Sequence, residues 1–254
     1  MISVAVAGCN GRMGSAVVDA VQNADDMTLV CGIDPHSSTT AFPVYSSISE
    51  AINNESFDVL VDFTQPDVVA STLAIALPAG IDCVVGTTGL SDETLQELAS
   101  TAKEGTSLFY APNFTTGAVL MMQFAKAAAP YFPEAEVLEF HHCNKKDAPS
   151  GTAMRTAQII SQARDFESSA PGRETELDGA QGARGANIEG VPVHSIRSMG
   201  YVASQEVVFG SMGQTLTIRH DSWDRTSYMP GVLLGIRSVG NCNGLVVGLE
   251  NFMA

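Results

Sequence analysis

The chain begins with Ile2-Ser-Val-Ala-Val-Ala-Gly-Cys-Asn-Gly-Arg-Met-Gly14 and continues to Met27-Thr-Leu-Val-Cys-Gly-Ile-Asp34. Residues 2–7 are apolar and β-rich, and three glycines with the spacing G-x-x-G-x-x-G follow them. A helical pattern starts at Ser15, and a second strand-like run ends in an acid twenty residues after Gly14. This order of strand, glycine turn, helix, strand and acid is typical of a dinucleotide-binding unit.

The glycine turn predicts a site for a pyrophosphate. Glycines let backbone N–H groups approach the phosphates, and the N-terminus of the next helix stabilises their charge. Asp34 can accept hydrogen bonds from a ribose diol and would repel a 2′-phosphate, which favours NADH. The alternative is a plain turn between a strand and a helix, because tight turns use glycine generally.

The alternation of strands and helices continues to about residue 115. We expect strands at 57–63, 81–85 and 106–110, a helix at 66–77 and another that begins after Ser91. Loops 86–89 and 111–114 follow two of these strands, at the end where doubly wound sheets bind ligands. They are predicted to flank the nicotinamide and its ribose, although each taken singly could be a routine connection.

The pattern then changes, which predicts two domains. Residues 116–130 and 151–163 read as helices, and 135–140, 192–199, 201–210 and 214–220 read as strands with short turns. Residues 165–190 read as a long mobile loop that could act as a lid. Residues 226–239 and 245–249 return to the α/β pattern.

The expected fold class is therefore α/β, with a Rossmann-like dinucleotide-binding domain and an inserted α+β domain that has a mixed sheet. Residues 1–113 with 224–254 would form the first domain. Residues 114–223 would form the second, for substrate binding and oligomerisation.

Composition excludes several classes of function. The formal net charge of −15 over 254 residues argues against binding to nucleic acid or to anionic membrane surfaces. The five cysteines are scattered without a C-x-x-C pair, so neither a disulfide framework nor a zinc site is expected. No signal peptide or membrane span is recognised, and no metal is predicted. These features fit a cytoplasmic protein.

Residues 139–153 carry the densest chemistry: Glu139-Phe-His-His-Cys-Asn-Lys-Lys-Asp-Ala-Pro-Ser-Gly-Thr-Ala153. A histidine can donate a proton near neutral pH, and Lys145 or Lys146 can supply fixed positive charge. Gly151 and Thr152 open a predicted helix, so their N–H groups can bind a carboxylate or phosphate. The alternative is a surface loop whose polar residues are only solvated.

This stretch resembles the signature of the dihydrodipicolinate reductase family: an acid, two histidines, a lysine and then Asp-Ala-Pro-Ser-Gly-Thr-Ala. Cys143, Asn144 and Lys146 depart from the common pattern of that family. The resemblance extends in order over nearly the whole chain, through Gly8–Gly14, Asp62-Phe-Thr64, Gly86-Thr-Thr-Gly89, Ala111-Pro-Asn-Phe114, Val193-His-Ser-Ile-Arg197 and Ile218-Arg-His-Asp221.

The resemblance implies reduction of 4-hydroxy-tetrahydrodipicolinate, a small dicarboxylate, to tetrahydrodipicolinate with NADH and/or NADPH in diaminopimelate and lysine biosynthesis. It implies His141 as general acid and Lys145 as a second proton donor or charge stabiliser, with His142, Gly151 and Thr152 holding the substrate. It also implies a cytoplasmic homotetramer built through the sheet of the second domain. The residues that it assigns to the dinucleotide are Gly8, Cys9, Asn10, Gly11, Arg12, Met13, Asp34, Gly86, Thr87, Thr88, Ala111, Pro112, Asn113 and Phe114.

Two rival hypotheses remain open. Another Rossmann-type amino-acid or aldehyde dehydrogenase could use Cys143, beside two histidines, as its nucleophile. A nucleotide-sensing binding protein would need no proton donor at all. Loss of activity on Cys143→Ser would favour the first, and absence of turnover would favour the second.

Overall fold

The computed structural model describes residues 1–36, 40–165, 179 and 182–253. The chain divides into two compact units. The first is Met1–Thr116 with Arg225–Ala254, and the second is Gly117–Asp224. Among the described helices, none has both the length and the apolar run that a membrane span requires.

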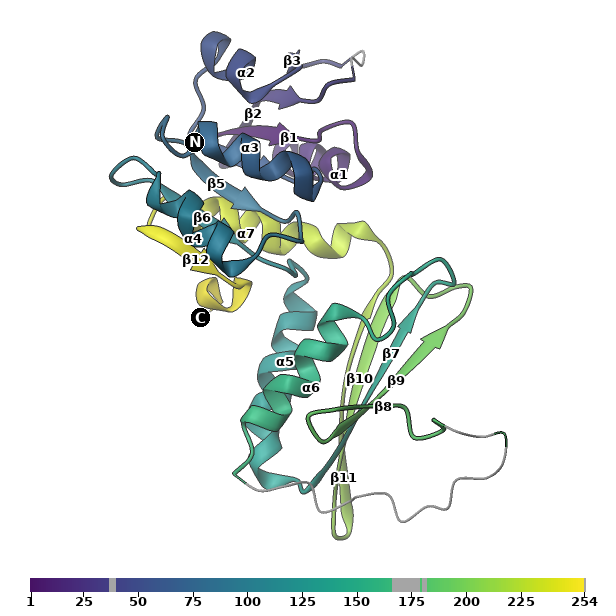
Figure 1. Cartoon of the computed structure of the whole chain (residues 1–254). Helices are drawn as coiled ribbons and strands as arrows, with labels where there is room; N and C mark the ends of the chain where they lie inside the picture. Colours follow the sequence, from purple (N-terminus) through teal and green to yellow (C-terminus); the bar gives the residue numbers. More distant parts are fainter. Residues whose placement is uncertain (37–39, 166–178, 180–181, 254) are drawn as a thin grey trace. The chain divides into compact units, whose positions relative to one another are not determined.

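The first unit is built on a parallel seven-stranded sheet with the order β12-β6-β5-β4-β1-β2-β3 (Figure 1). Its strands are almost wholly apolar because both faces of the sheet are covered. This confirms the predicted Rossmann-like fold. The strands are β1 (Ile2–Ala7), β2 (Met27–Ile33), β3 (Val44–Tyr45), β4 (Val59–Asp62), β5 (Asp82–Val85), β6 (Ser107–Tyr110) and β12 (Gly244–Val247).

Helices pack on both faces of this sheet. Helices α2 (Ile48–Asn54), α3 (Pro66–Ala76) and α4 (Asp92–Ser100) bury their apolar sides on one face. Helices α1 (Arg12–Gln22) and α7 (Met229–Val239) contact each other and the strands from the opposite face. Short 3-10 turns, η2 (Arg225–Tyr228) and η3 (Leu249–Phe252), flank α7 and β12.

The second unit contains a mixed five-stranded sheet with the order β11-β10-β7-β9-β8. β7 and β9 are parallel, and the other neighbours are antiparallel, as the sequence predicted for this sheet. Its strands are β7 (Glu134–His141), β8 (Ala186–Ile188), β9 (Val191–Arg197), β10 (Ala203–Ser211) and β11 (Gln214–Ser222).

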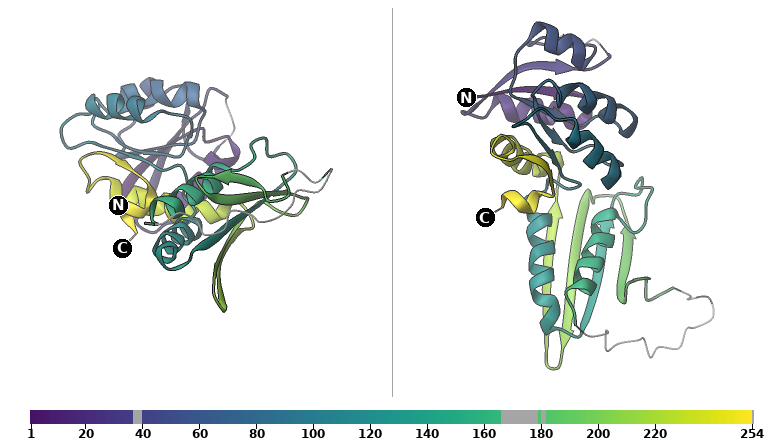
Figure 2. Two further views of the ribbon diagram at one scale, coloured as in Figure 1. Left: turned by 60° about the horizontal axis from the view of Figure 1, so that its bottom comes forward. Right: turned by 60° about the vertical axis from the view of Figure 1, so that its left-hand side comes forward.

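One face of the second sheet holds the core of this unit. Helices α5 (Thr116–Ala128), which leads into η1 (Ala129–Tyr131), and α6 (Gly151–Gln162) lie on the same side of the sheet (Figure 2). Their alanines pack against alternate residues of the strands, such as Val137 and Val207. Because side chains alternate along a strand, Glu139 also points to this covered face and is 0% exposed.

Three elements differ from expectation. β3 and α2 were not anticipated, because the sequence between β2 and β4 gave no strong periodicity. β8 lies inside the segment expected to be a loop, so that prediction is wrong for residues 186–188. The strand is short and largely exposed, and it is held by pairing with β9, which a local pattern does not report. Most of the remaining expected loop, residues 166–178 and 180–181, lies outside the described residues.

Candidate active site

The glycine turn after β1 is a tight loop that packs against its own helix. Gly8 has φ +74°, a conformation that favours glycine, and its N–H donates to the Ile33 carbonyl at 2.8 Å. The Gly11 N–H donates to the Gly8 carbonyl at 2.9 Å, and α1 begins at Arg12. A Cβ on Gly14 would lie 1.9 Å from the Gly8 oxygen. The turn therefore leads directly into the start of α1, whose positively polarised end favours a phosphate.

Asp34 follows β2 and lies beside this turn. Its carboxylate accepts from the backbone N–H of Asn10 at 3.2 Å and of His36 at 3.0 Å. The Asn10 side chain also donates to the His36 carbonyl at 2.6 Å, which ties the two loops together. A cavity of about 450 Å³ next to them is lined by Cys9, Asn10, Ser15 and His36 among others. Its volume is within the range of small-molecule sites.

Asp62, at the end of β4, joins its own loop to the candidate loop 86–89. Its buried Oδ1 accepts from the backbone N–H and hydroxyl of Thr64 at 2.9 and 2.7 Å, and from the Thr87 hydroxyl at 2.8 Å. Burial raises the pKa of Asp62, although the hydrogen bonds from Thr64 and Thr87 oppose the shift. The sequence had placed Asp62 in the resemblance but had given it no role.

Aromatic rings connect the remaining loops of the first unit. A Cβ on Gly86 would lie 2.0 Å from the Phe63 ring, so glycine is required for this packing. Phe63 also contacts Phe114, with ring centroids 5.5 Å apart, and the Asn113 side chain accepts from the Thr115 N–H at 2.8 Å. The predicted dinucleotide residues follow β1, β2, β5 and β6, so they lie at the carboxyl edge of one sheet. Thr88 and Pro112 are exposed there.

In the second unit, His141 ends β7 and contacts a buried acid. Its Nδ1 is hydrogen-bonded to Oε2 of Glu139, and the two side chains share one face of the strand because they are two residues apart. The side chain of His141 is 14% exposed, so one edge of the ring remains accessible.

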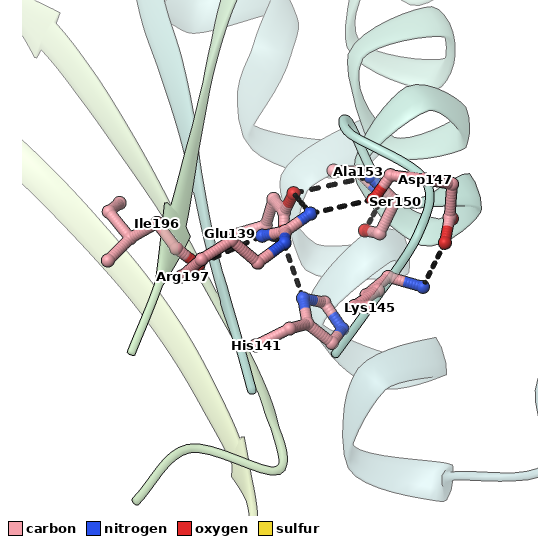
Figure 3. Close-up of polar contacts among 8 residues, drawn as sticks. All are labelled: Glu139, His141, Lys145, Asp147, Ser150, Ala153, Ile196 and Arg197. Atoms are coloured by element: carbon pink, nitrogen blue, oxygen red, sulfur yellow. Dashed lines mark hydrogen bonds and ion pairs between the residues drawn. The ribbon is translucent and has the colours of Figure 1, made fainter. Parts of the chain in front are cut away.

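Glu139 is held from two further elements (Figure 3). Arg197 on β9 donates from Nη1 to Oε2 at 2.9 Å and from Nη2 to Oε1 at 2.8 Å. The N–H of Ser150, just before α6, donates to Oε1 at 3.3 Å. Nη2 of Arg197 also donates to the Asp147 carbonyl at 2.8 Å, so β7, β9 and the loop before α6 are fixed to one another.

These contacts set the charges of the pair. Burial alone would raise the pKa of Glu139, but hydrogen bonds from Arg197, Ser195 and His141 outweigh it and hold the pKa below its usual value. Burial lowers the pKa of His141. The positive charges of Lys145 and Arg197 lower this pKa further, and the Glu139 carboxylate only partly opposes the shift. Without a ligand, the ring is therefore mostly neutral at pH 7 beside an ionised Glu139.

Lys145 is the lysine that lies near His141. Its side chain is half-buried, and its ammonium forms an ion pair with Asp147 at 2.9 Å. Figure 3 shows Lys145 beside the ring of His141. That hydrogen bond lowers the pKa of Asp147. Lys146 is exposed, as are His142 and Cys143.

The start of α6 offers a second place for an anion. Ser150 caps the helix by accepting from the Ala153 N–H at 3.2 Å, and the preceding Ala148–Pro149 peptide bond is cis. Gly151 and Thr152 form the first turn, and a Cβ on Gly151 would meet no atom within 4 Å. This open, positively polarised end suits a carboxylate. Among the described residues, no three His, Cys, Asp or Glu side chains gather to hold a metal ion.

Glu139 and Arg197 lie within the segments that carry the resemblance, but the sequence reasoning gave neither of them a role. The two-residue spacing of Glu139 and His141 on a predicted strand was a usable signal for Glu139. Arg197 gave no such signal, because it lies 58 residues from Glu139 in sequence and meets it only through the pairing of β7 with β9.

Comparisons with known proteins agree with this architecture. Residues 2–114 match the family model for the N-terminus of dihydrodipicolinate reductase, and residues 117–253 match the model for its C-terminus. A 4-hydroxy-tetrahydrodipicolinate reductase of Mycolicibacterium vanbaalenii is 47% identical over 249 residues, covering 97% of each chain. One of Streptomyces coelicolor is 48% identical over 254 residues, covering 99% of this chain and 98% of the relative.

A solved structure is similar over the full length. It is the dipicolinate-bound dihydrodipicolinate reductase of Paenisporosarcina sp. TG-14, with a TM-score of 0.88 and 41% sequence identity. The similarity covers 99% of each chain, so it includes both units and the segment that carries the paired histidines.

Proposed function

Because the chain belongs to the dihydrodipicolinate reductase family, we propose that it reduces 4-hydroxy-tetrahydrodipicolinate to tetrahydrodipicolinate with NADH or NADPH. The reaction adds one hydride and one proton to the ring and releases one water, as a step of diaminopimelate and lysine biosynthesis. The observation that carries the proposal is the cluster of His141, Lys145 and the start of α6 in a chain that also has a Rossmann unit.

A nicotinamide dinucleotide fits the first unit. Gly8 and Gly14 let the turn pack closely against its own helix and the chain after β4, and the Asp34 carboxylate is held beside this turn at the end of β2. When bound in its reduced form, the dinucleotide supplies the hydride. The residues proposed to hold it are Gly8, Cys9, Asn10, Gly11, Arg12, Met13, Asp34, Gly86, Thr87, Thr88, Ala111, Pro112, Asn113 and Phe114.

The second unit is proposed to bind the dicarboxylate and to protonate it. Lys145 supplies positive charge, His142 can donate a hydrogen bond from its ring, and the N–H groups of Gly151 and Thr152 can receive a carboxylate. A dianion near His141 raises the pKa of the ring, because opposite charge favours the imidazolium. The charged ring then gives its proton to the substrate carbon as a general acid.

We also propose that the protein is a cytoplasmic homotetramer assembled through the second sheet. The face of this sheet opposite α5 and α6 carries half-buried apolar side chains, such as Leu138, Phe140 and Val208. Apolar groups gathered on one face are typical of a contact surface.

Oxidation of reduced nicotinamide in the presence of freshly generated 4-hydroxy-tetrahydrodipicolinate tests the activity. We expect turnover that depends on both substrates, with NADH at least as efficient as NADPH because of Asp34. If the rate of oxidation does not exceed the rate without enzyme, the proposed function is contradicted. A strong preference for NADPH would contradict only the role given to Asp34.

A further inference from the structure

We infer that Glu139 is a positioning residue: it holds His141 in the tautomer with hydrogen on Nδ1, which makes Nε2 the atom that exchanges a proton with the substrate. This inference rests on the proposed function, because it assigns the reacting atom of the proposed general acid. It concerns a residue that acts through His141 and does not itself need to touch the substrate.

The direction of the hydrogen bond follows from the charge on Glu139. An ionised carboxylate only accepts hydrogen bonds, so the ring nitrogen that faces it must be the donor. Oε1 already accepts from Arg197 and Ser150, and Oε2 accepts from Arg197 and His141. Nδ1 therefore keeps its hydrogen, and the neutral ring has its lone pair on Nε2.

Arg197 is what allows a carboxylate to remain ionised at a site that is 0% exposed. Its two parallel hydrogen bonds form a bidentate pair, the strong arrangement for an arginine and a carboxylate. The charged groups around the ring are thus Glu139 on its own strand, Arg197 on β9, and Lys145 and Asp147 in the loop after β7.

The consequence is a defined path for the proton. The neutral ring takes up a proton on Nε2 when the dianionic substrate raises its affinity for protons. In the reaction, the Nε2–H bond breaks and a C–H bond forms on the substrate, while Nδ1–H stays with Glu139. The ring then returns to the same neutral tautomer, ready for reprotonation from water.

Glu139→Gln is the sharpest change, because the same shape then carries an NH₂ group. Two fixed donors, from Arg197 and Ser150, point at Oε1, and only one, Nη1 of Arg197, points at Oε2, so the amide oxygen belongs at Oε1 and the NH₂ faces Nδ1. The His141 ring must then accept at Nδ1 and carry its hydrogen on Nε2. We expect ¹⁵N NMR of histidine-labelled protein to show the Nδ1–H tautomer in the wild type and the Nε2–H tautomer in Glu139→Gln. The His141 signal is identified by its loss in His141→Ala.

Kinetics give the second readout. We expect kcat of Glu139→Gln to fall at least about tenfold, since general acids contribute roughly 10²–10⁴-fold, while KM for the substrate changes much less. The pH above which kcat declines should move down, because loss of the negative charge lowers the pKa of His141. Asp26→Asn is the control: it breaks another bidentate pair, with Arg237 at 2.7 and 2.9 Å, and should leave the tautomer and kcat unchanged.

A second variant separates positioning from charge balance. Glu139→Gln alone leaves the charge of Arg197 without its buried partner and could unfold the protein. The double variant, Glu139→Gln with Arg197→Gln, removes both charges of the pair. We expect the double variant to fold and still to have low kcat. Recovery of kcat in the double variant, or an unchanged tautomer with full kcat in the single one, would overturn the inference. Absence of turnover by the wild type would instead refute the proposed function, and the NMR result would stand apart from it.

Discussion

His141 combines accessibility with a fixed neighbour. One ring nitrogen is tied to Glu139, and the side chain is 14% exposed. Because burial lowers the pKa of the ring, the free protein holds little imidazolium at neutral pH. A general acid of this kind must gain its proton together with the substrate, which links its chemistry to binding.

This link predicts how the rates depend on pH. The pH profile of kcat/KM reports the free protein, where the pKa of His141 is lowered, and that of kcat reports the complex with the dianion. The acid must be protonated, so both rates decline as pH rises through the relevant pKa. We expect kcat/KM to decline at lower pH than kcat in steady-state measurements over a pH series. A decline of kcat first, or rates that increase with pH, would contradict the role of His141.

The two adjacent lysines should differ strongly. Lys145 is half-buried and lies close enough to affect the pKa of His141, whereas Lys146 is exposed. A hydrogen bond to a charged group contributes about 1.5–3 kcal/mol, so Lys145→Ala should lower kcat/KM about tenfold or more. Lys146→Ala is the matched control and should stay within about twofold of the wild type. Equal losses for the two variants would contradict the role given to Lys145.

At the scale of elements, each proposed site is built where a strand ends and a helix begins. β1 and α1 meet through Gly8 and Gly14, and β7 leads to α6 through a loop that Ser150 closes as the helix cap. Both loops lead into the positively polarised start of a helix, which favours an anion. The two loops are therefore proposed for the two anionic ligands, the dinucleotide and the dicarboxylate.

The glycine turn gives a test at this scale. Gly14→Ala places a Cβ 1.9 Å from the Gly8 carbonyl oxygen, so the turn and the start of α1 must separate. Overpacking of this kind destabilises by about 1–3 kcal/mol. We expect the Kd for the dinucleotide to rise at least about tenfold in a fluorescence titration, with a lower Tm. The control, Gln22→Ala at the exposed end of α1, should change neither quantity, and an unchanged Kd in Gly14→Ala would refute the assigned phosphate site.

The same elements show what sequence could and could not predict. Three local patterns predicted the fold of the first unit correctly: the apolar run of β1, the glycine turn and the spacing to Asp34. β8 escaped prediction because a short, exposed strand is held only by its neighbour β9. His141 was predicted from a local motif. Its link through Glu139 to Arg197 could not be, because that link depends on the register of β7 and β9.

At the scale of the whole molecule, the protein is strongly acidic, with a formal net charge of −15. A dianionic substrate is therefore repelled by most of the surface and must be bound through local positive groups. Lys145, the start of α6 and a protonated His141 are such groups within one loop and its flanking elements. Local positive groups of this kind are what an acidic chain needs if it is to bind an acidic ligand.

The proposed tetramer is tested by charge on the free face of the second sheet. Val208 lies between Val207 and Phe209, which face the helices, so its own side chain points the other way. Val208→Glu would bury a charge in the proposed interface and should yield smaller species in light scattering. Ile75→Glu on α3, at a position 41% exposed, is the control and should leave the wild-type tetramer intact. A monomeric wild type would contradict the proposed assembly.

His141 is proposed to supply the proton in the reaction of this reductase. The most direct measurement is kcat of His141→Ala with 4-hydroxy-tetrahydrodipicolinate and NADH, alongside the Kd for the dinucleotide. We predict a loss of about 10²-fold or more in kcat with a Kd close to wild type, because the ring acts only on the substrate. Cys143→Ser, which removes a neighbouring exposed thiol, should keep full activity. Full turnover in His141→Ala, or its loss in Cys143→Ser, would contradict the account.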